Sequence, residues 1–453
     1  MKFVLDNESF VKNLEDNVDY RIFGAEFACV YIANTCMTMA MSLLFRYADF
    51  VRYLGGTEAD LGWIVGLGTV GAICMRVFQG VAIDRVGAGR IWLGSLLMVI
   101  FSLACHLQIE NVHNVWIYLV RILFMTGMAG SFGASITFVS QKTPKHRTGE
   151  MIGLLGSSGF IGMAIGPSMV DYLMRTDEWN RTVINRPFWV SMALIGAAFL
   201  SASAASLLGA KMQIAKKPKK RSVRRVRTPI WWLVRRYHPG AILVMGIAMG
   251  VGINIPFAFV RPFARELSIT GIGPYFLVYA GTAFTVRLFC RKLPDVWGVR
   301  PAVLVGTSFL AASMFSFALV SGEITLLLPA ALGGVAHAFV FPAAMAGGSL
   351  SFPLRYRGLA TTLMLTMFDL GNLAGQPVFG TLVSWIEPTG WPAYPLTFSL
   401  AGCLLVLFSG MYWALSSDAA KEPDSGEFSV GIVQTADIMA AKSSETSTEW
   451  LKP

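Results

Sequence analysis

The chain has 453 residues, of which 54% are hydrophobic and only 14% are charged, and its formal net charge is +10. Soluble globular proteins carry about 25% charged residues, so this chain lacks the polar surface that a water-soluble protein of its length needs. The composition therefore excludes an ordinary soluble protein and indicates that most of its apolar surface faces lipid.

The N-terminal segment, residues 1–22, is charged and mixed in sign. It lacks the basic, apolar and small-residue pattern of a cleaved signal peptide, so the first apolar stretch is expected to be retained. Twelve apolar stretches follow, each near the length of about 20 residues that a bilayer core requires. They are residues 23–46, 60–82, 90–109, 115–139, 149–173, 187–209, 239–261, 272–293, 301–320, 325–349, 358–384 and 394–416.

The charged residues Arg46, Asp49 and Arg52 are interpreted as the outer loop that separates the first two spans. The predicted fold is an all-α membrane protein with twelve transmembrane helices in two six-helix bundles, residues 23–209 and 239–416. A basic linker, residues 210–238, joins the bundles. Residues 417–453 form a polar tail that is predicted to be disordered, as is the rule for segments with few apolar residues.

The distribution of basic residues predicts the orientation. With both termini in the cytoplasm, the inner segments hold 27 of the 37 Lys and Arg residues and the outer segments hold 7. Cytoplasmic loops carry such an excess of basic residues. The linker alone contains eleven Lys or Arg residues between Lys211 and Arg236 and no acid. Nucleic-acid binding is one reading of this run, but contact with anionic lipid headgroups is favoured.

The two halves of the chain resemble each other. A shift of 211 residues places Arg76 on Arg287, Asp84 on Asp295 and Gly87 on Gly298. A shift of 209 residues places Gly162 on Gly371 and Gly166 on Gly375. Two stretches with nearly the same period predict a duplicated six-helix unit. Many secondary transporters build a central site between two such repeats.

The loop after the second span carries a motif, Gly80-VAI-Asp84-Arg85-V-Gly87-AG-Arg90. It resembles the cytoplasmic loop signature of the major facilitator superfamily. A weaker second copy contains Asp295, Gly298 and Arg300, with Arg291 in place of the first glycine. The resemblance covers residues 23–416 and implies that Asp84 and Arg85 hold the cytoplasmic side shut in one state. The alternative is a surface ion pair, which contributes less than about 1 kcal/mol.

The fifth span contains Gly153, Gly162, Gly166 and Pro167. This spacing is similar to the motif of the drug–proton antiporter branch, although Val170-Asp171 stands where that motif ends in glycines. The resemblance implies proton-coupled efflux. Small residues four apart also let helices pack closely, here and at Gly371 and Gly375, so a packing role without any antiport meaning is the alternative.

Polar residues at membrane depth are costly and are therefore candidates for substrate binding or coupling. Arg121 resembles the fourth-helix arginine that the family links to proton coupling, although an arginine near a span end also reaches the interface by snorkelling. The family resemblance implies a central cavity between helices one, four, seven and ten. Burial disfavours the ionised carboxyl group, which makes Glu26 and Asp369 candidate proton carriers. The full set of candidates is Glu26, Asn34, Arg76, Arg121, Asn254, Arg287, His337 and Asp369.

The sequence predicts a secondary transporter that exchanges a small-molecule substrate against protons. Uptake by proton symport is the first alternative, and a transporter-like sensor without flux is another. A membrane-embedded enzyme acting on lipid is the third, although no nucleophile or metal set for it stands out. No catalytic residues, metal site or cofactor are predicted, because the chain lacks the ATP-binding P-loop, hydrolase motifs and Cys/His clusters. The expected partners are the substrate, protons and membrane lipids, without nucleic acid. The chain is expected to be a monomer in a cell membrane, most simply a bacterial inner membrane.

Overall fold

The computed structural model describes residues 24–143, 147–175, 179–213, 230–290, 297–353 and 356–416. Every regular element within these ranges is a helix, which confirms the all-α prediction. The predicted N-terminal segment, residues 1–22, the tail, residues 417–453, most of the linker, and Asp295 lie outside the described residues.

The N-terminal bundle contains six long helices. The first span is α2 (Ala25–Leu43), which continues through the 3₁₀ turn η1 (Leu44–Arg46) into α3 (Tyr47–Tyr53). The predicted outer loop at Arg46 and Asp49 is therefore wrong, because the helical path continues through these charged residues and buries them. The other helices are α4 (Glu58–Val86), α5 (Ala88–His106), α6 (Val115–Lys142), α7 (Thr148–Leu173) and α8 (Arg181–Gln213).

The C-terminal bundle repeats this arrangement. It consists of α10 (Ile242–Glu266), α11 (Gly273–Phe289), α13 (Val299–Ser316), α14 (Glu323–Leu350), α15 (Arg357–Ile386) and α16 (Ala393–Leu415), with short turns η2 (Phe317–Leu319) and η4 (Glu387–Thr389). Ten helices of the described chain are long and apolar enough to cross a membrane. Helix α11, with 17 residues, and α15 are not among these ten, and with them the described chain has twelve long helices, which is consistent with the predicted twelve.

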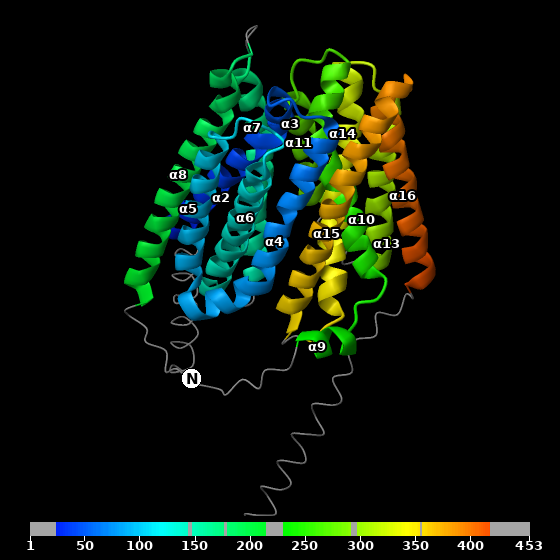
Figure 1. The fold of residues 1–453 in the computed structure, drawn as a ribbon. Helices are drawn as coiled ribbons and strands as arrows, with labels where there is room; N and C mark the ends of the chain where they lie inside the picture. The colour runs from blue at the N-terminus through cyan, green and yellow to red at the C-terminus, as the bar shows by residue number, and fades with distance from the viewer. Residues whose placement is uncertain are drawn as a thin grey trace, which may run out of the picture.

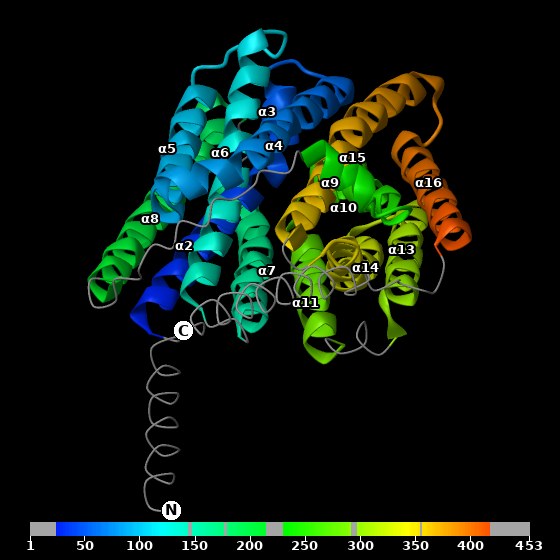
Figure 2. The same ribbon diagram turned by 90° about the horizontal axis from the view of Figure 1, so that it is seen from below.

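The two bundles stand side by side (Figure 1) and meet along two seams. Helix α4 packs against α15, and α7 packs against α11, whereas the other extensive contacts lie within each bundle. The short helix α9 (Ile230–Arg236) lies beneath the C-terminal bundle. We call this side the linker face and the opposite side, which carries α3, the far face. Viewed from the linker face, the bundles form two separate groups of helices (Figure 2).

Local sequence signals fix several helix ends. Thr57 and Asp60 form a reciprocal capping box that begins α4, a device that satisfies the first free amide groups of a helix. Gly87 and Gly298 lie at the starts of α5 and α13 with φ of +98° and +85°. Only glycine adopts such angles without strain. These two glycines are related by the predicted 211-residue shift, so the repeat extends to the backbone conformation of the loop.

Candidate functional site: a central cavity closed on the far face

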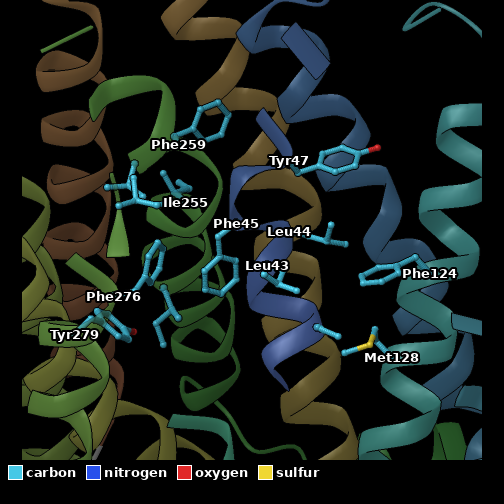
Figure 3. Packing of buried hydrophobic residues seen from close by; sticks show 14 of the residues in the cluster. Leu43, Leu44, Phe45, Tyr47, Phe124, Met128, Ile255, Phe259, Phe276 and Tyr279 are labelled. Carbon is cyan, nitrogen blue, oxygen red and sulfur yellow. The ribbon is translucent and has the colours of Figure 1, made fainter. Parts of the chain in front are cut away.

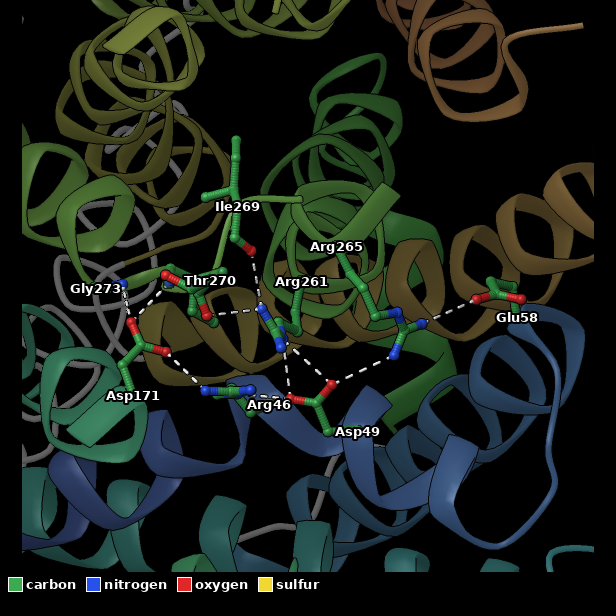
Figure 4. A network of polar contacts seen from close by, with 10 residues as sticks. Arg46, Asp49, Glu58, Asp171, Arg261, Arg265, Ile269, Thr270 and Gly273 are labelled. Atoms are coloured by element: carbon green, nitrogen blue, oxygen red, sulfur yellow. Dashed lines mark hydrogen bonds and ion pairs between the residues drawn. The ribbon is translucent and has the colours of Figure 1, made fainter. Parts of the chain in front are cut away.

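A buried ionic network joins the two bundles on the far face (Figure 4). Its centre is Asp49 on α3, whose side chain has 0% exposure. Within the N-terminal bundle, Arg46 Nε donates to Asp49 Oδ2 at 2.6 Å. From α10 of the other bundle, Arg261 Nε approaches the same oxygen at 3.0 Å, and Arg265 Nη1 approaches Asp49 Oδ1 at 3.4 Å. One carboxylate thus binds three arginines from both halves of the chain.

Asp171 on α7 makes a second link across the bundles. Its Oδ2 accepts hydrogen bonds from the backbone amides of Ile272 at 2.7 Å and Gly273 at 2.6 Å, at the first turn of α11. Its Oδ1 accepts from Arg46 Nη1 at 3.2 Å. No side chain of α11 itself caps this helix. The N-terminal cap of α11 is therefore supplied by a carboxylate of the opposite bundle, where it also meets the positive end of the helix dipole.

The far-face network, defined as Arg46, Asp49, Glu58, Asp171, Arg261 and Arg265, is electrically balanced. It contains three arginines and three carboxylates, with Glu58 Oε1 at 3.6 Å from Arg265 Nη2. Burying charges costs several kcal/mol per ion, which such a network regains only while every partner is in place. Parting the bundles on this face removes the cross-bundle partners of both Asp49 and Asp171. The network therefore stabilises the closed arrangement of this face.

An aromatic layer lies beneath the network, because Phe45 and Phe257 precede Arg46 and Arg261 on helical segments that run towards the far face. Figure 3 shows Phe45 and Phe276 of this layer. The ring of Phe45, from η1, lies 5.0 Å from that of Phe257 on α10 and 4.5 Å from that of Phe276 on α11, measured between centroids. Phe257 in turn meets Tyr279 edge to face at 5.4 Å. The two contacts of Phe45 cross from one bundle to the other, and the contact between Phe257 and Tyr279 lies within the C-terminal bundle. The far face is thus closed by ionic contacts above and by apolar packing below.

The seam glycines show that the closure is confined to the far half of the molecule. A Cβ atom added to Gly62 on α4 would overlap the carbonyl oxygen of Gln376 on α15, and one added to Gly273 on α11 would lie 2.6 Å from Ser168 Oγ on α7. Towards the linker face, on the same helix faces, Gly80, Gly153 and Gly358 have nothing within 4 Å of such an atom. The helices that touch on the far face are therefore separated near the linker face.

Gly62→Ala is expected to part the far face, because a methyl group there meets backbone that cannot move aside. Overpacking of this kind costs about 1–3 kcal/mol. We expect spin labels at Glu110→Cys and Ser321→Cys, both exposed on the far face, to shift to longer distances in electron–electron double resonance. The labelled proteins would carry serine in place of the six natural cysteines, so that only the two introduced cysteines react with the spin label. Gly94→Ala, where nothing lies within 4 Å, is the matched control. Identical distance distributions in the two variants would contradict the steric argument.

Directly below the closure lies a cavity of about 70 Å³ between the bundles. Most of its lining is apolar and comes from the first span, α4 and α10. Four polar side chains interrupt this lining, namely Arg121, Asn254, Asn372 and Gln376. Gln376 Nε2 donates to the Asn254 carbonyl at 2.8 Å and to Asn372 Oδ1 at 3.0 Å. These bonds order the two amides on the α15 side of the cavity.

Arg121 faces this cavity and is 8% exposed. Its guanidinium carbon lies 4.5 Å from the centroid of the Tyr47 ring and 5.1 Å from that of Phe124. Such cation–π contacts contribute about 0.5–2 kcal/mol each. Nevertheless, Nε and Nη1 of Arg121 have no hydrogen-bond partner among the described residues. The snorkelling alternative is therefore wrong, because the side chain is held inside the bundle instead of reaching the interface.

Two related arginines lie at the seams nearer the linker face. Arg76 on α4 pairs with Asp369 on α15, with Nε to Oδ2 at 2.5 Å and Nη2 to Oδ1 at 3.4 Å. Its repeat counterpart Arg287 lies on α11, with its guanidinium carbon 6.0 Å from the ring of Phe160 on α7. Phe160 occupies the position that a 209-residue shift relates to Asp369. The seam between α4 and α15 thus contains a salt bridge, and the corresponding position in the seam between α7 and α11 contains a cation–π contact.

The remaining polar candidates lie apart from the 70 Å³ cavity. Glu26 is in the first turn of α2 and pairs with Lys142 at the end of α6, so its predicted place in the central cavity is wrong for this conformation. Asn34 donates to Ser158 Oγ at 2.6 Å between α2 and α7. His337 Nδ1 lies 2.8 Å from the hydroxyl oxygen of Tyr279, below the aromatic layer.

The motif residues are distributed as follows. Gly80, Asp84 and Arg85 lie on the last turns of α4 at the linker face, where Asp84 and Arg85 are exposed. Arg90 Nη1 lies 3.5 Å from the Val86 carbonyl oxygen, and Arg300 donates to the Trp413 carbonyl at 2.7 Å. The role of Asp84 and Arg85 in closing the linker face stays a prediction, since that face is parted in this conformation.

The glycine motif of α7 packs within its own bundle. A Cβ atom at Gly162 would overlap Thr38, and one at Gly166 would overlap Ser42, both on α2. Gly371 packs in the same way against Ile247 and Gly250 on α10, and Gly375 lies near Val251. Pro167 lies inside α7 directly after Gly166. Gly162, Gly166 and Gly371 therefore serve close helix packing, whereas Gly153 has nothing within 4 Å of an added Cβ atom. This packing role does not depend on the direction of transport.

The sequence analysis does not identify several residues of the site. It assigns Asp49 to a loop and treats Asp171 only as a departure from the antiporter motif. It does not name Tyr47, Asn372 or Gln376 as candidates. A signal existed for the last two, since Asp369, Asn372 and Gln376 recur on one side of an otherwise apolar helix at spacings of three and four. No comparable pattern links Asp49 to Arg261, because 212 residues separate them.

Comparison with known proteins places the chain in a family. Residues 27–375 match the Major Facilitator Superfamily, and the chain belongs to it. Niacin transporter NiaP of Acinetobacter baylyi is 31% identical over 132 residues, which is 29% of each chain. Uncharacterized transporter YybO of Bacillus subtilis is 29% identical over 148 residues, 33% of each chain. These alignments therefore span a third or less of either relative.

A longer alignment and two solved structures agree with the family. The uncharacterized MFS-type transporter MJ1560 of Methanocaldococcus jannaschii is 23% identical over 369 residues, 78% of this chain and 89% of its own. The fold matches a D-xylose–proton symporter with a TM-score of 0.70 at 15% identity, over 87% of this chain and 98% of that one. It matches the nucleoside transporter NupG with a TM-score of 0.68 at 13% identity, over 86% and 98%. At these identities the likeness concerns the fold.

Proposed function

We propose that this protein is a secondary active transporter that moves a small solute across a cell membrane by alternating access, coupled to protons. The observation that carries the proposal is the far-face network. A balanced set of charges, of which Arg46, Asp49 and Arg261 are buried, joins the bundles on one face, while the same helices part towards the other. Opening the far face requires this network to separate, which converts the structure into the second state of a two-state carrier.

The linker face is proposed to be cytoplasmic. Its loops carry the excess of basic residues that the positive-inside rule requires. The structure would then represent a state open to the cytoplasm, with both termini on that side. Labelling of single cysteines from either side of sealed cells would test this orientation.

For proton coupling we propose the Arg76–Asp369 pair. It bridges the bundles within the membrane, and both side chains are largely buried, with 17% and 6% exposure. Protonating Asp369 would remove the charge that holds Arg76 and loosen this seam. A buried pair that loses one charge is strongly destabilised, so the protonation state of Asp369 and the opening of the seam are linked.

Asp369→Asn is expected to uncouple transport from the proton gradient, because the amide stays neutral at every pH. We expect proton flux driven by substrate to fall at least about 10-fold, while exchange of substrate across the membrane without a gradient continues. The measurement is internal pH and labelled substrate in liposomes containing the variant. Glu387→Gln, which changes an exposed carboxylate directly after α15, is the matched control. Undiminished substrate-driven proton flux in Asp369→Asn would remove this residue from coupling.

The proposed direction is efflux by antiport, as the spacing of Gly153, Gly162, Gly166 and Pro167 favours. Uptake by symport is the alternative, favoured by Asp171 at a position where the antiporter motif has glycine. Adding a panel of metabolites and cationic drugs outside proteoliposomes, while internal pH is recorded, separates the two. Antiport raises the proton concentration on the side that loses substrate, and symport lowers it. Saturable binding without any flux would favour a sensor instead.

A further inference from the structure

We propose that the 70 Å³ cavity binds a solute with a single carboxylate, and that Arg121 holds this group. This inference rests on the proposed function, in that it assigns the substrate class of the cavity. Arg121 is the one charged residue in the described lining, and the lining contains no aspartate or glutamate. A cavity with this charge attracts anions and disfavours the cationic drugs that the motif of α7 suggests.

The unpaired donors of Arg121 support a bound ligand. The guanidinium carbon lies over the rings of Tyr47 and Phe124. Nε and Nη1 lack hydrogen-bond partners among the described residues, although the residue is more than nine-tenths buried. Buried donors are almost always satisfied. The Tyr47 hydroxyl beside it is also buried and without a partner among the described residues.

The donor geometry of Arg121 and the charge of the cavity favour a carboxylate among the possible anions. An arginine edge matches two carboxylate oxygens in a planar, bidentate arrangement. A phosphate monoester brings nearly two negative charges to a site with one cation, so one charge would stay unpaired. Phe45 and Phe257 provide an apolar wall for the body of the ligand, and Asn372 and Gln376 provide amides on the opposite helix. A small aromatic or aliphatic monocarboxylate fits this combination.

A glycine on α4 sets the position of Arg121. A Cβ atom at Gly68 would lie 2.7 Å from Arg121 Cγ, so the arginine stem occupies the space that any larger residue would fill. Gly68→Ala therefore displaces the guanidinium without changing the charge of the cavity. This variant tests the geometry of the site separately from its electrostatics.

The test uses the purified full-length protein with benzoate, the neutral isostere benzamide and the dianion phenyl phosphate. Binding is measured as the ligand-dependent rise in unfolding temperature and by competition with labelled benzoate. We expect benzoate to bind and benzamide to bind at least about 30-fold more weakly, as is typical when one partner of a buried charge pair is removed. Arg121→Gln should abolish the preference for benzoate. Arg121→Lys keeps the positive charge but loses the paired N–H donors of the guanidinium group, and it should retain part of the preference.

Each outcome decides the proposal. Equal binding of benzoate and benzamide, tighter binding of phenyl phosphate, or an undiminished preference for benzoate in Arg121→Gln overturns it. If Arg121→Gln does not fold, Gly68→Ala decides, since weaker benzoate binding there supports the proposal and unchanged binding overturns it. Benzoate binding that depends on Arg121 without flux would leave this site in place and refute transport. Proton-coupled flux of neutral or cationic solutes, without carboxylate binding, would support transport and refute the carboxylate site.

Discussion

Asp49→Asn is expected to shift the protein from the far-face-closed state to a far-face-open state by at least about 100-fold in population. The reason is the set of arginines around this carboxylate. Arg46, Arg261 and Arg265 all lie within 3.4 Å of its oxygens, and the first two are almost fully buried. Removing one partner of a buried ion pair costs about 3–5 kcal/mol, because the other charge is left without compensation.

This cost applies to the closed state alone. In an open far face the arginines reach water and no longer need Asp49, so the substitution changes the balance between the two states instead of destabilising both. A difference of about 3 kcal/mol corresponds to more than a 100-fold change in the equilibrium constant. Transport cycles that must pass through the closed state should slow accordingly.

The Glu110 and Ser321 spin-label pair measures this shift directly. We expect the wild type to give the shorter distance and Asp49→Asn to give the longer one. Glu387→Gln, which changes an exposed carboxylate at the far-face end of α15, should leave the distance unchanged. A closed distance in Asp49→Asn would mean that the network does not hold the far face together, and that the aromatic layer alone does.

The spans and the repeat could be predicted from the sequence because their signals are local. Apolar runs identify helices, and paired glycines at Gly87 and Gly298 mark the same turn in each half. The prediction failed where charges are satisfied across the bundles. Arg46 and Asp49 read as a loop, since isolated charges are costly in a membrane. In the structure they pair with each other, and their other partners, Asp171, Arg261 and Arg265, lie more than 120 positions away, which no local pattern reveals.

The same limit explains the mixed result for the candidate site. Arg121, Asn254 and the Arg76–Asp369 pair lie between the bundles as their depth in the spans suggests. Glu26 does not, because a polar residue in the first turn of an apolar helix reaches the bundle surface, where Lys142 meets it. Depth along a helix can be read from the sequence, whereas the direction that a side chain faces depends on packing between helices.

Substitution of Asp171 is expected to have the second large effect on the closure of the far face, because Asp171 both caps α11 and pairs with Arg46. Hydrogen bonds to a charged group contribute about 1.5–3 kcal/mol each, and an N-terminal cap contributes about 0.5–2 kcal/mol. Asp171→Gly, which restores the residue type of the antiporter motif, is expected to lose both contributions and to open the far face about 30-fold or more. Asp171→Asn keeps an oxygen that can accept from the α11 amides and should open it less.

Hydrogen exchange provides a readout specific to the cap. In Asp171→Gly the amides of Ile272 and Gly273 lose their acceptor, so peptides covering the start of α11 should exchange faster, while peptides from α13 should not change. Tyr172→Ala changes the exposed neighbour and serves as the control. Unchanged exchange at the start of α11 would show that the helix finds another cap. If exchange rises and the far face opens together, the end of α11 is held by the opposite bundle only while that face is closed, which couples the order of this helix to the transport cycle.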